Sequence, residues 1–98
     1  MNEAEQIQQV KRIMLTAGAP VEVKFDKPSG RFLVKNFSAG AVYASFEKTV
    51  DTNNSIKILS QMFQVCEISE RGGSDGQPKT FSIYLTGSGE VEVQELWV

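Results

Sequence analysis

From Val21 onward, apolar and polar residues alternate in short runs that are separated by glycine-containing segments. Val21, Val23 and Phe25 alternate with charged residues, which is the pattern of a strand with one face in a core. Residues 31–47 (RFLVKNFSAGAVYASFE) follow as two apolar strands around a glycine-containing turn, and we expect them to form a hairpin. The pattern predicts an all-β chain of about seven to eight short strands.

The second half of the chain continues this pattern. Further strands are expected at residues 55–59, 62–68, 80–86 and 90–98, and turns at residues 27–30 and 87–89. In the strand at 80–86, the alternation places Phe81, Ile83 and Leu85 in the core. Residues 62–68 carry apolar groups on both faces, so we expect a central strand there. In the last strand the apolar parity slips by one residue, which predicts a β-bulge near Glu95.

The N-terminal segment allows two interpretations. In the first, Asn2 caps a helix that Gly18 terminates. In the second, residues 1–9 form an N-terminal arm or short helix, and residues 10–16 form a strand. We favour the second interpretation, because the chain after Gly18 has the period of β-structure throughout.

Length and charge bound the class of protein. A chain of 98 residues has the size of one domain, and we expect residues 10–98 to form a single antiparallel β-sandwich, either jelly-roll or immunoglobulin-like. Ten basic and twelve acidic residues give a net charge of −2, which provides no reason to expect nucleic acid or an anionic membrane as a partner. No apolar run approaches the roughly 20 residues that span a bilayer. The polar, acidic N-terminus does not have the pattern of a secretory signal, so we expect synthesis in a reducing cytoplasm.

Residues suited to catalysis or metal binding are scarce. The chain has no histidine, the commonest general base and metal ligand. Cys66 lies in the expected strand at residues 62–68, which is mostly apolar, so we expect a buried or half-buried strand residue rather than a nucleophile. Asp51-Thr52-Asn53-Asn54 lacks the glycine and the terminal glutamate of a calcium-binding loop. We therefore expect no enzymatic activity, no cofactor and no metal site.

Three aromatic residues are the candidate contact residues. Tyr43 and Tyr84 are out of phase with the apolar residues of their strands, and Trp97 lies near the C-terminus. They either fill a second layer of the sandwich or form a contact surface, where tyrosine and tryptophan are enriched. Subunit pairing would also cover the edge strands of a sandwich of this size. Asn36 and Ser38, by contrast, flank a strand end, where we expect their side chains to hydrogen-bond nearby backbone.

The order of several short motifs resembles that of a known group of proteins. The motifs are Val34-Lys35-Asn36, then Val42-Tyr43-Ala44, and finally Gly87-Ser88-Gly89-Glu90-Val91. With these motifs, residues 18–98 resemble small β-sandwich structural proteins of tailed bacteriophages and prophages, of the head-decoration or fibre-base type. The chain departs from the pattern at Leu59-Ser60-Gln61-Met62, where that group has a proline-alanine-glycine turn.

The resemblance implies a non-enzymatic structural module that is made in the bacterial cytoplasm and incorporated into a virion. Its partners would be further copies of itself or other virion proteins, and it would form a homo-oligomer. No functional residue carries over, because the shared motifs are turns and core. The alternative is a carbohydrate- or ligand-binding module in which Tyr43, Tyr84 or Trp97 stacks on a sugar.

Overall fold

The computed structural model describes residues 9–48, 50, 55–68 and 79–96, and in this part of the chain it contains strands and no helix. The strands are β1 (Val10–Leu15), β2 (Val21–Ser29), β3 (Arg31–Asn36), β4 (Val42–Ser45), β5 (Ile56–Ile58), β6 (Phe63–Glu67), β7 (Thr80–Thr86) and β8 (Gly89–Glu95). The preference for a strand at residues 10–16 is confirmed by β1, whereas the expected arm lies outside the described residues except for Gln9. No described segment is a helix that could span a membrane.

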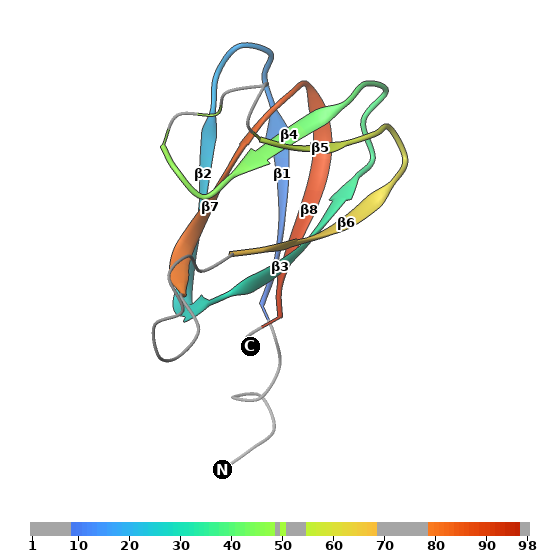
Figure 1. Cartoon of the computed structure of the whole chain (residues 1–98). Coiled ribbons are helices and arrows are strands. Elements are labelled where there is room, and N and C mark those ends of the chain that lie inside the picture. The colour runs from blue at the N-terminus through green and yellow to red at the C-terminus, as the bar shows by residue number, and fades with distance from the viewer. Residues whose placement is uncertain (1–8, 49, 51–54, 69–78, 97–98) are drawn as a thin grey trace.

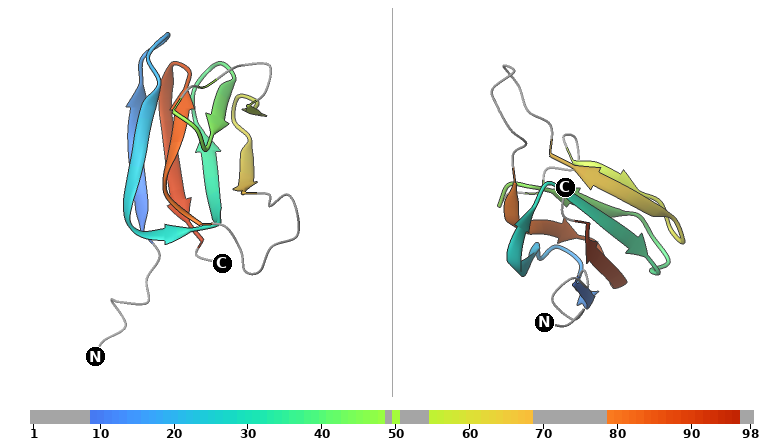
Figure 2. Two further views of the ribbon diagram at one scale, coloured as in Figure 1. Left: turned by 60° about the vertical axis from the view of Figure 1, so that its left-hand side comes forward. Right: turned by 90° about the horizontal axis from the view of Figure 1, so that it is seen from below.

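The strands form two four-stranded antiparallel sheets that pack face to face (Figures 1 and 2). The first sheet has the order β1-β8-β3-β6, and the second sheet has the order β2-β7-β4-β5. Strand β1 pairs with β8, β2 with β7, β3 with β6, and β4 with β5. This nested pairing is that of a long two-stranded ribbon rolled up on itself, which is a jelly roll. The predicted antiparallel β-sandwich is therefore confirmed, with the jelly-roll order of strands.

The core lies between the sheets and consists of inward-facing apolar side chains from both. Its aromatic centre is Phe32, whose ring stacks on Phe25 of the second sheet with the centroids 5.7 Å apart. The ring of Phe46 packs beside Phe32 at 5.9 Å. Ile83 and Leu85 are buried as predicted, but Phe81, near the start of β7 where the pairing with β2 is irregular, is 46% exposed. Burial of these side chains is the main contribution to the stability of the sandwich.

Consecutive strands lie in opposite sheets everywhere except at β4 and β5. The predicted hairpin at residues 31–47 is therefore wrong, because β3 belongs to the first sheet and β4 to the second. Asn36 holds the chain where it crosses: its Oδ1 accepts hydrogen bonds from the backbone N–H and the hydroxyl of Ser38. Its Nδ2 donates to the carbonyl oxygens of Gly40 and Ile58. The expectation that Asn36 and Ser38 bond nearby backbone is confirmed.

The predicted turns at residues 27–30 and 87–89 are also crossings between the sheets. Lys27 to Ser29 belong to β2, where the pairing with β7 is irregular between Lys24 and Ser29. At the second crossing, Gly87 and Gly89 have φ angles of +157° and +119°. A Cβ atom at Gly89 would lie 2.5 Å from the Cβ of Ser38, so the β7–β8 crossing approaches the β3–β4 crossing closely at this end of the sandwich.

Two further expectations are corrected. Strand β8 keeps its register with β3 as far as Glu95, which is paired with Phe32 and fully buried, so the predicted bulge is absent from this strand. Strand β6 is an edge strand of the first sheet and not a central one. The strand has apolar residues on both faces, but only one face is in the core: Cys66 faces the core, while Phe63 and Val65 face outward.

Candidate interaction surface

The outer face of the first sheet carries a row of interacting side chains across all four strands. In register, Arg12 of β1 lies beside Glu92 of β8, then Lys35 of β3, then Phe63 of β6. The carboxylate of Glu92 forms ion pairs with both cations: its Oε1 lies 3.0 Å from Nη2 of Arg12, and its Oε2 lies 3.2 Å from Nζ of Lys35. Nζ of Lys35 also lies 5.6 Å from the ring centroid of Phe63. The row therefore joins the charged centre of the sheet to its β6 edge.

The two cations lower the pKa of Glu92. The hydrogen bond from Arg12 is the largest cause, followed by the hydrogen bond from Lys35, while partial burial of the carboxylate opposes both. The pKa of Arg12 is raised by its hydrogen bond and its charge interaction with Glu92, and by the charge of Glu90. Glu92 is consequently ionised and occupied by intramolecular partners at neutral pH.

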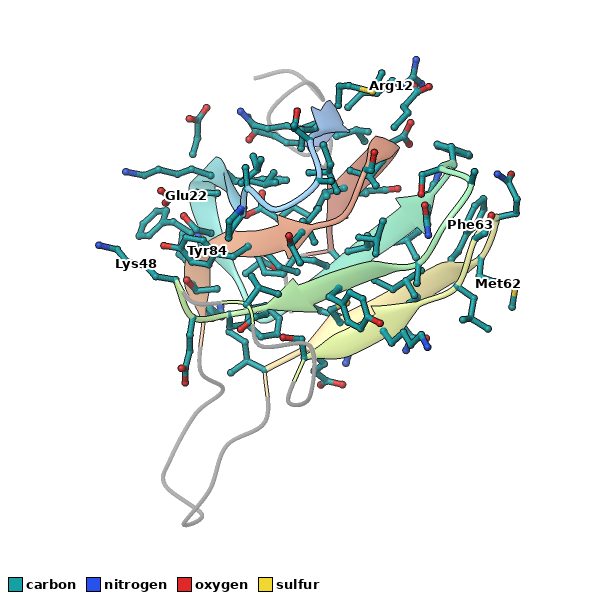
Figure 3. The ribbon with its side chains drawn as sticks, turned by 90° about the horizontal axis from the view of Figure 1, so that it is seen from above. Arg12, Glu22, Lys48, Met62, Phe63 and Tyr84 are labelled. Atoms are coloured by element: carbon teal, nitrogen blue, oxygen red, sulfur yellow. The ribbon has the colours of Figure 1, made fainter. Side chains whose placement is uncertain are left out.

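Exposed apolar side chains gather at the β6 edge of this face. We call Phe37, Leu59, Met62, Phe63 and Val65 the β6 patch. The exposed fractions of Phe63 and Val65 are 55% and 44%, and the ring of Phe37 packs edge-on against Phe63 with the centroids 5.8 Å apart. Figure 3 shows Met62 and Phe63 projecting outward at this end of the molecule, on the side away from Tyr84 and Glu22. Clusters of exposed apolar side chains of this kind are typical of interaction sites.

The turn that precedes β6 is held in place by hydrogen bonds to the β3–β4 crossing. Met62 N–H donates to the carbonyl oxygen of Leu59 at 3.0 Å, and Gln61 adopts a positive φ of 64°. Nε2 of Gln61 donates to the carbonyl oxygens of Phe37 and Ser38, and the Ser60 hydroxyl donates to that of Ser38. These hydrogen bonds hold the β6 patch in position.

The predicted contact residues lie elsewhere. Tyr43 of β4 and Tyr84 of β7 share the outer face of the second sheet, where Tyr43 is paired with Thr86 and Tyr84 with Ser45. Both tyrosines are half-buried. Trp97 lies outside the described residues. The structure thus brings Tyr43 and Tyr84 to one face, separate from the β6 patch on the other sheet.

A shallow hollow with a volume of about 530 Å³ lies beside Tyr43 at the end of the sandwich where three crossings meet. Its lining is mostly small residues, including Gly18, Gly40 and Gly87, with Ser88 and Thr86 as hydroxyl groups. Tyr84 does not line it. The hollow therefore offers a ligand one tyrosine, with its ring and hydroxyl, and two further side-chain hydroxyls.

Cys66 is fully buried in β6, as the sequence predicted. Burial raises the pKa of its thiol to about 12, so the thiol is protonated at neutral pH. Among the described residues, no group of three or more acidic, cysteine or histidine side chains is placed to hold a metal ion. Asp51-Thr52-Asn53-Asn54 lies outside those residues.

Comparison of the chain with models of protein families, with curated proteins and with solved structures found no match. Sequence reasoning did not identify the β6 patch, although the signal was present: a strand with two apolar faces is either central, or an edge strand with an uncovered outer face. The second possibility is the one that the fold realises.

Proposed function

We propose that this chain is a non-enzymatic structural module that acts through subunit contacts, as a virion component of a tailed bacteriophage or prophage. The observation that supports the contact role is the β6 patch. It combines aromatic, methionine and aliphatic side chains beside a polar, charged row, which is the composition of an apolar interface centre with a polar rim. The setting in a virion is proposed from the resemblance of residues 18–98.

The chemistry of the most polar groups favours contact over catalysis. Glu92 is held between two cations, so it is a weak base, and the pKa of about 12 at Cys66 makes the thiol a poor nucleophile. Glu22 likewise accepts a hydrogen bond of 2.6 Å from the Ser82 hydroxyl. The contacts of Glu92 with its two cations and of Glu22 with Ser82 help to stabilise the outer faces of the two sheets.

The experiment that tests the virion assignment uses the bacterial strain that carries the gene. The prophage is induced, particles are purified on a density gradient, and each fraction is analysed for the chain by mass spectrometry. The proposal predicts that the chain sediments with the particles and is released from them only by denaturant. Recovery of the chain only in the soluble fraction, while intact particles lack it, would overturn the assignment.

The hollow beside Tyr43 supports a second candidate, a carbohydrate- or ligand-binding module in which the ring stacks on a sugar. Calorimetric titration of the protein with a panel of monosaccharides and oligosaccharides tests it. This candidate predicts saturable heat that Tyr43→Ala abolishes and that Tyr84→Ala, outside the hollow, leaves unchanged. Titrations without saturable heat, or an equal effect of both variants, would rule against it.

A further inference from the structure

We propose that two copies of this chain pair through β6, antiparallel about a two-fold axis at Val65, so that their first sheets join into one continuous sheet. The inference rests on the proposed function, because it names the partner of the β6 patch as a second copy. The residues that carry it are Phe63, Val65 and Glu67, together with Lys35.

Three of the four sheet edges are protected against pairing. At the other edge of the first sheet, β1 has Arg12 at its centre, so pairing with a second β1 about that residue would place two guanidinium groups opposite each other. In the second sheet, β5 is only three residues long with Lys57 in the middle. Strand β2 carries alternating charges, a register irregularity and Pro28. Short length, charge, bulges and proline are the devices by which natural edge strands avoid pairing.

Strand β6 has none of these devices along Phe63-Gln64-Val65-Cys66, and its one charged residue, Glu67, is the last. No described strand pairs with its outer edge. Its outer edge therefore presents backbone groups that pair with no described strand, next to exposed apolar side chains. This combination is what edge-to-edge association requires.

The hydrogen bonds to β3 show which residues of β6 face the free edge. The N–H of Asn36 donates to the carbonyl of Met62, and the N–H of Ile68 donates to the carbonyl of Gly30, both at 3.0 Å. Since bonded and non-bonded pairs alternate in an antiparallel ladder, the even-numbered residues of β6 bond to β3. The backbone groups of Phe63, Val65 and Glu67 therefore point to the free edge. In agreement, the exposed Gln64 amide reaches the Val65 carbonyl at 3.2 Å from that side.

The positions of these three residues select the register. An axis at Val65 gives all three residues a partner. Val65 pairs with the partner's Val65, Phe63 pairs with the partner's Glu67, and Glu67 pairs with the partner's Phe63. Each pair exchanges two backbone hydrogen bonds. An axis at Glu67 would instead place two carboxylates directly opposite each other, which is unfavourable. The Gln64 amide has to release the Val65 carbonyl so that the partner's N–H can take its place.

The side chains on the outer face match in this register. At the centre, Val65, which lies beside Leu33 in the first sheet, meets the partner's Val65 and extends the apolar row across the joint. On each side, the partner's Glu67 lies next to Phe63. The ring of Phe63 is also in cation–π contact with Nζ of Lys35. A carboxylate of one copy and an ammonium group of the other thus flank the same ring. No like charges on β6 oppose each other.

Edge prolines test the proposal with a matched control. The N–H of Val65 points away from β3, so Val65→Pro removes no ladder hydrogen bond within the copy. The N–H of Val10 in β1 likewise points to the free edge at the opposite side of the sheet. The neighbouring residue Gln9 is the one that bonds to β8, since its carbonyl accepts from the N–H of Glu95, and bonded and non-bonded residues alternate along the strand. Both are exposed valines on the same face, at 44% and 50%.

Sedimentation velocity of the full chain, at concentrations from about 1 μM to about 1 mM, measures the association. The proposal predicts a monomer–dimer equilibrium for the native chain and for Val10→Pro, and a dissociation constant at least about tenfold higher for Val65→Pro. Circular dichroism confirms that the variants are folded. If Val65→Pro does not fold, Val65→Lys replaces it, because this substitution places two ammonium groups opposite each other at the axis. Val10→Lys is then the control.

Three outcomes would overturn the inference: a native chain that is monomeric throughout, equal weakening by the β1 and β6 substitutions, or dimers that survive Val65→Pro. None of them overturns the proposed function by itself. A monomeric chain that still sediments with phage particles, and loses this association on Val65→Lys, has the proposed role with a different virion protein at β6. A chain that dimerises through β6 but never sediments with particles retains the inference without the virion assignment.

Discussion

Nδ2 of Asn36 donates a hydrogen bond of 3.0 Å to the carbonyl oxygen of Ile58, and this buried contact ties β3 of the first sheet to the end of β5 in the second. The same side chain also holds Ser38 and Gly40 in the crossing between the sheets. Asn36 is fully buried, and each of its polar atoms has a partner. Its amide is therefore a structural centre of the jelly roll and of the turn that supports the β6 patch.

Asn36→Ala is expected to lower the free energy of unfolding by about 3 kcal/mol, because the buried N–H of Ser38 and the buried carbonyl of Ile58 lose this partner. Urea unfolding followed by circular dichroism measures the change. Gln64→Ala, which removes an exposed amide with one hydrogen bond, is the control and is expected to cost less than about 0.5 kcal/mol. Equal costs for the two substitutions would contradict the role of Asn36.

Gly89→Ala is expected to cost about 3 kcal/mol of stability, because it combines an unfavourable φ of +119° with a Cβ atom 2.5 Å from the Cβ of Ser38. Gly40→Ala is the matched control, since nothing lies within 4 Å of its Cβ position. The control is expected to change stability by less than about 1 kcal/mol. Thermal unfolding of both variants measures the difference, and a Gly89→Ala protein as stable as the control would show that the β3–β4 and β7–β8 crossings do not touch.

The strand positions were predictable from the sequence, and their assignment to sheets was not. Alternation such as that of Phe32 and Val34 shows that one face of a strand is buried. It does not show whether the next strand lies beside that strand or across the core from it. The predicted hairpin at residues 31–47 failed for this reason, since the crossing depends on the contact of Asn36 with Ile58, 22 residues away.

The candidate site was predictable only in part, for a related reason. Tyr43 and Tyr84 were correctly placed out of phase with the core, because phase is a local property. The exposure of Phe63 and Val65 depends on β6 lying at an edge, which strand order alone decides. The bulge predicted near Glu95 failed because the change of apolar parity was taken for a break in register, whereas the continuous register with Phe32 places Glu95 in the interior.

The pH dependence of stability is expected to report on Glu92. Its pKa in the folded protein is lowered, mainly by the hydrogen bond from Arg12 and then by that from Lys35. The stabilisation is therefore fully present above the ordinary glutamate pKa of 4.5 and is lost as the pH falls through the lowered value. Urea unfolding between pH 7 and pH 3 is expected to show a steeper acid loss for the native chain than for Glu92→Gln.

Arg12→Gln provides the internal control for this prediction. Because it removes the largest cause of the lowered pKa, it is expected to move the acid loss to higher pH while leaving Glu92 in place. Parallel stability curves for the native chain, Glu92→Gln and Arg12→Gln would contradict the account of the charged row.

Cys66 is expected to be unreactive in the folded protein. Because burial raises the pKa of its thiol from 9.0 to about 12, the thiolate fraction at neutral pH is about a thousandfold lower than for an ordinary cysteine. Reaction with Ellman's reagent at pH 8 is expected to be slow in buffer and complete within minutes in guanidinium chloride. Rapid labelling of the folded chain would contradict the burial of this residue in β6.

Cross-linking at residue 65 tests whether two copies meet at β6. In the proposed pairing, residue 65 lies opposite itself with the Cα atoms about 5.5 Å apart, whereas the two copies of residue 10 lie at the far ends of the joined sheet, about 33 Å apart. A short bifunctional thiol reagent added to Val65→Cys is predicted to give a covalent dimer on a denaturing gel, and Val10→Cys, with the same exposed geometry, is predicted to give none. A Val65→Cys protein that remains monomeric on the gel, or a Val10→Cys protein that cross-links equally well, would contradict pairing through β6.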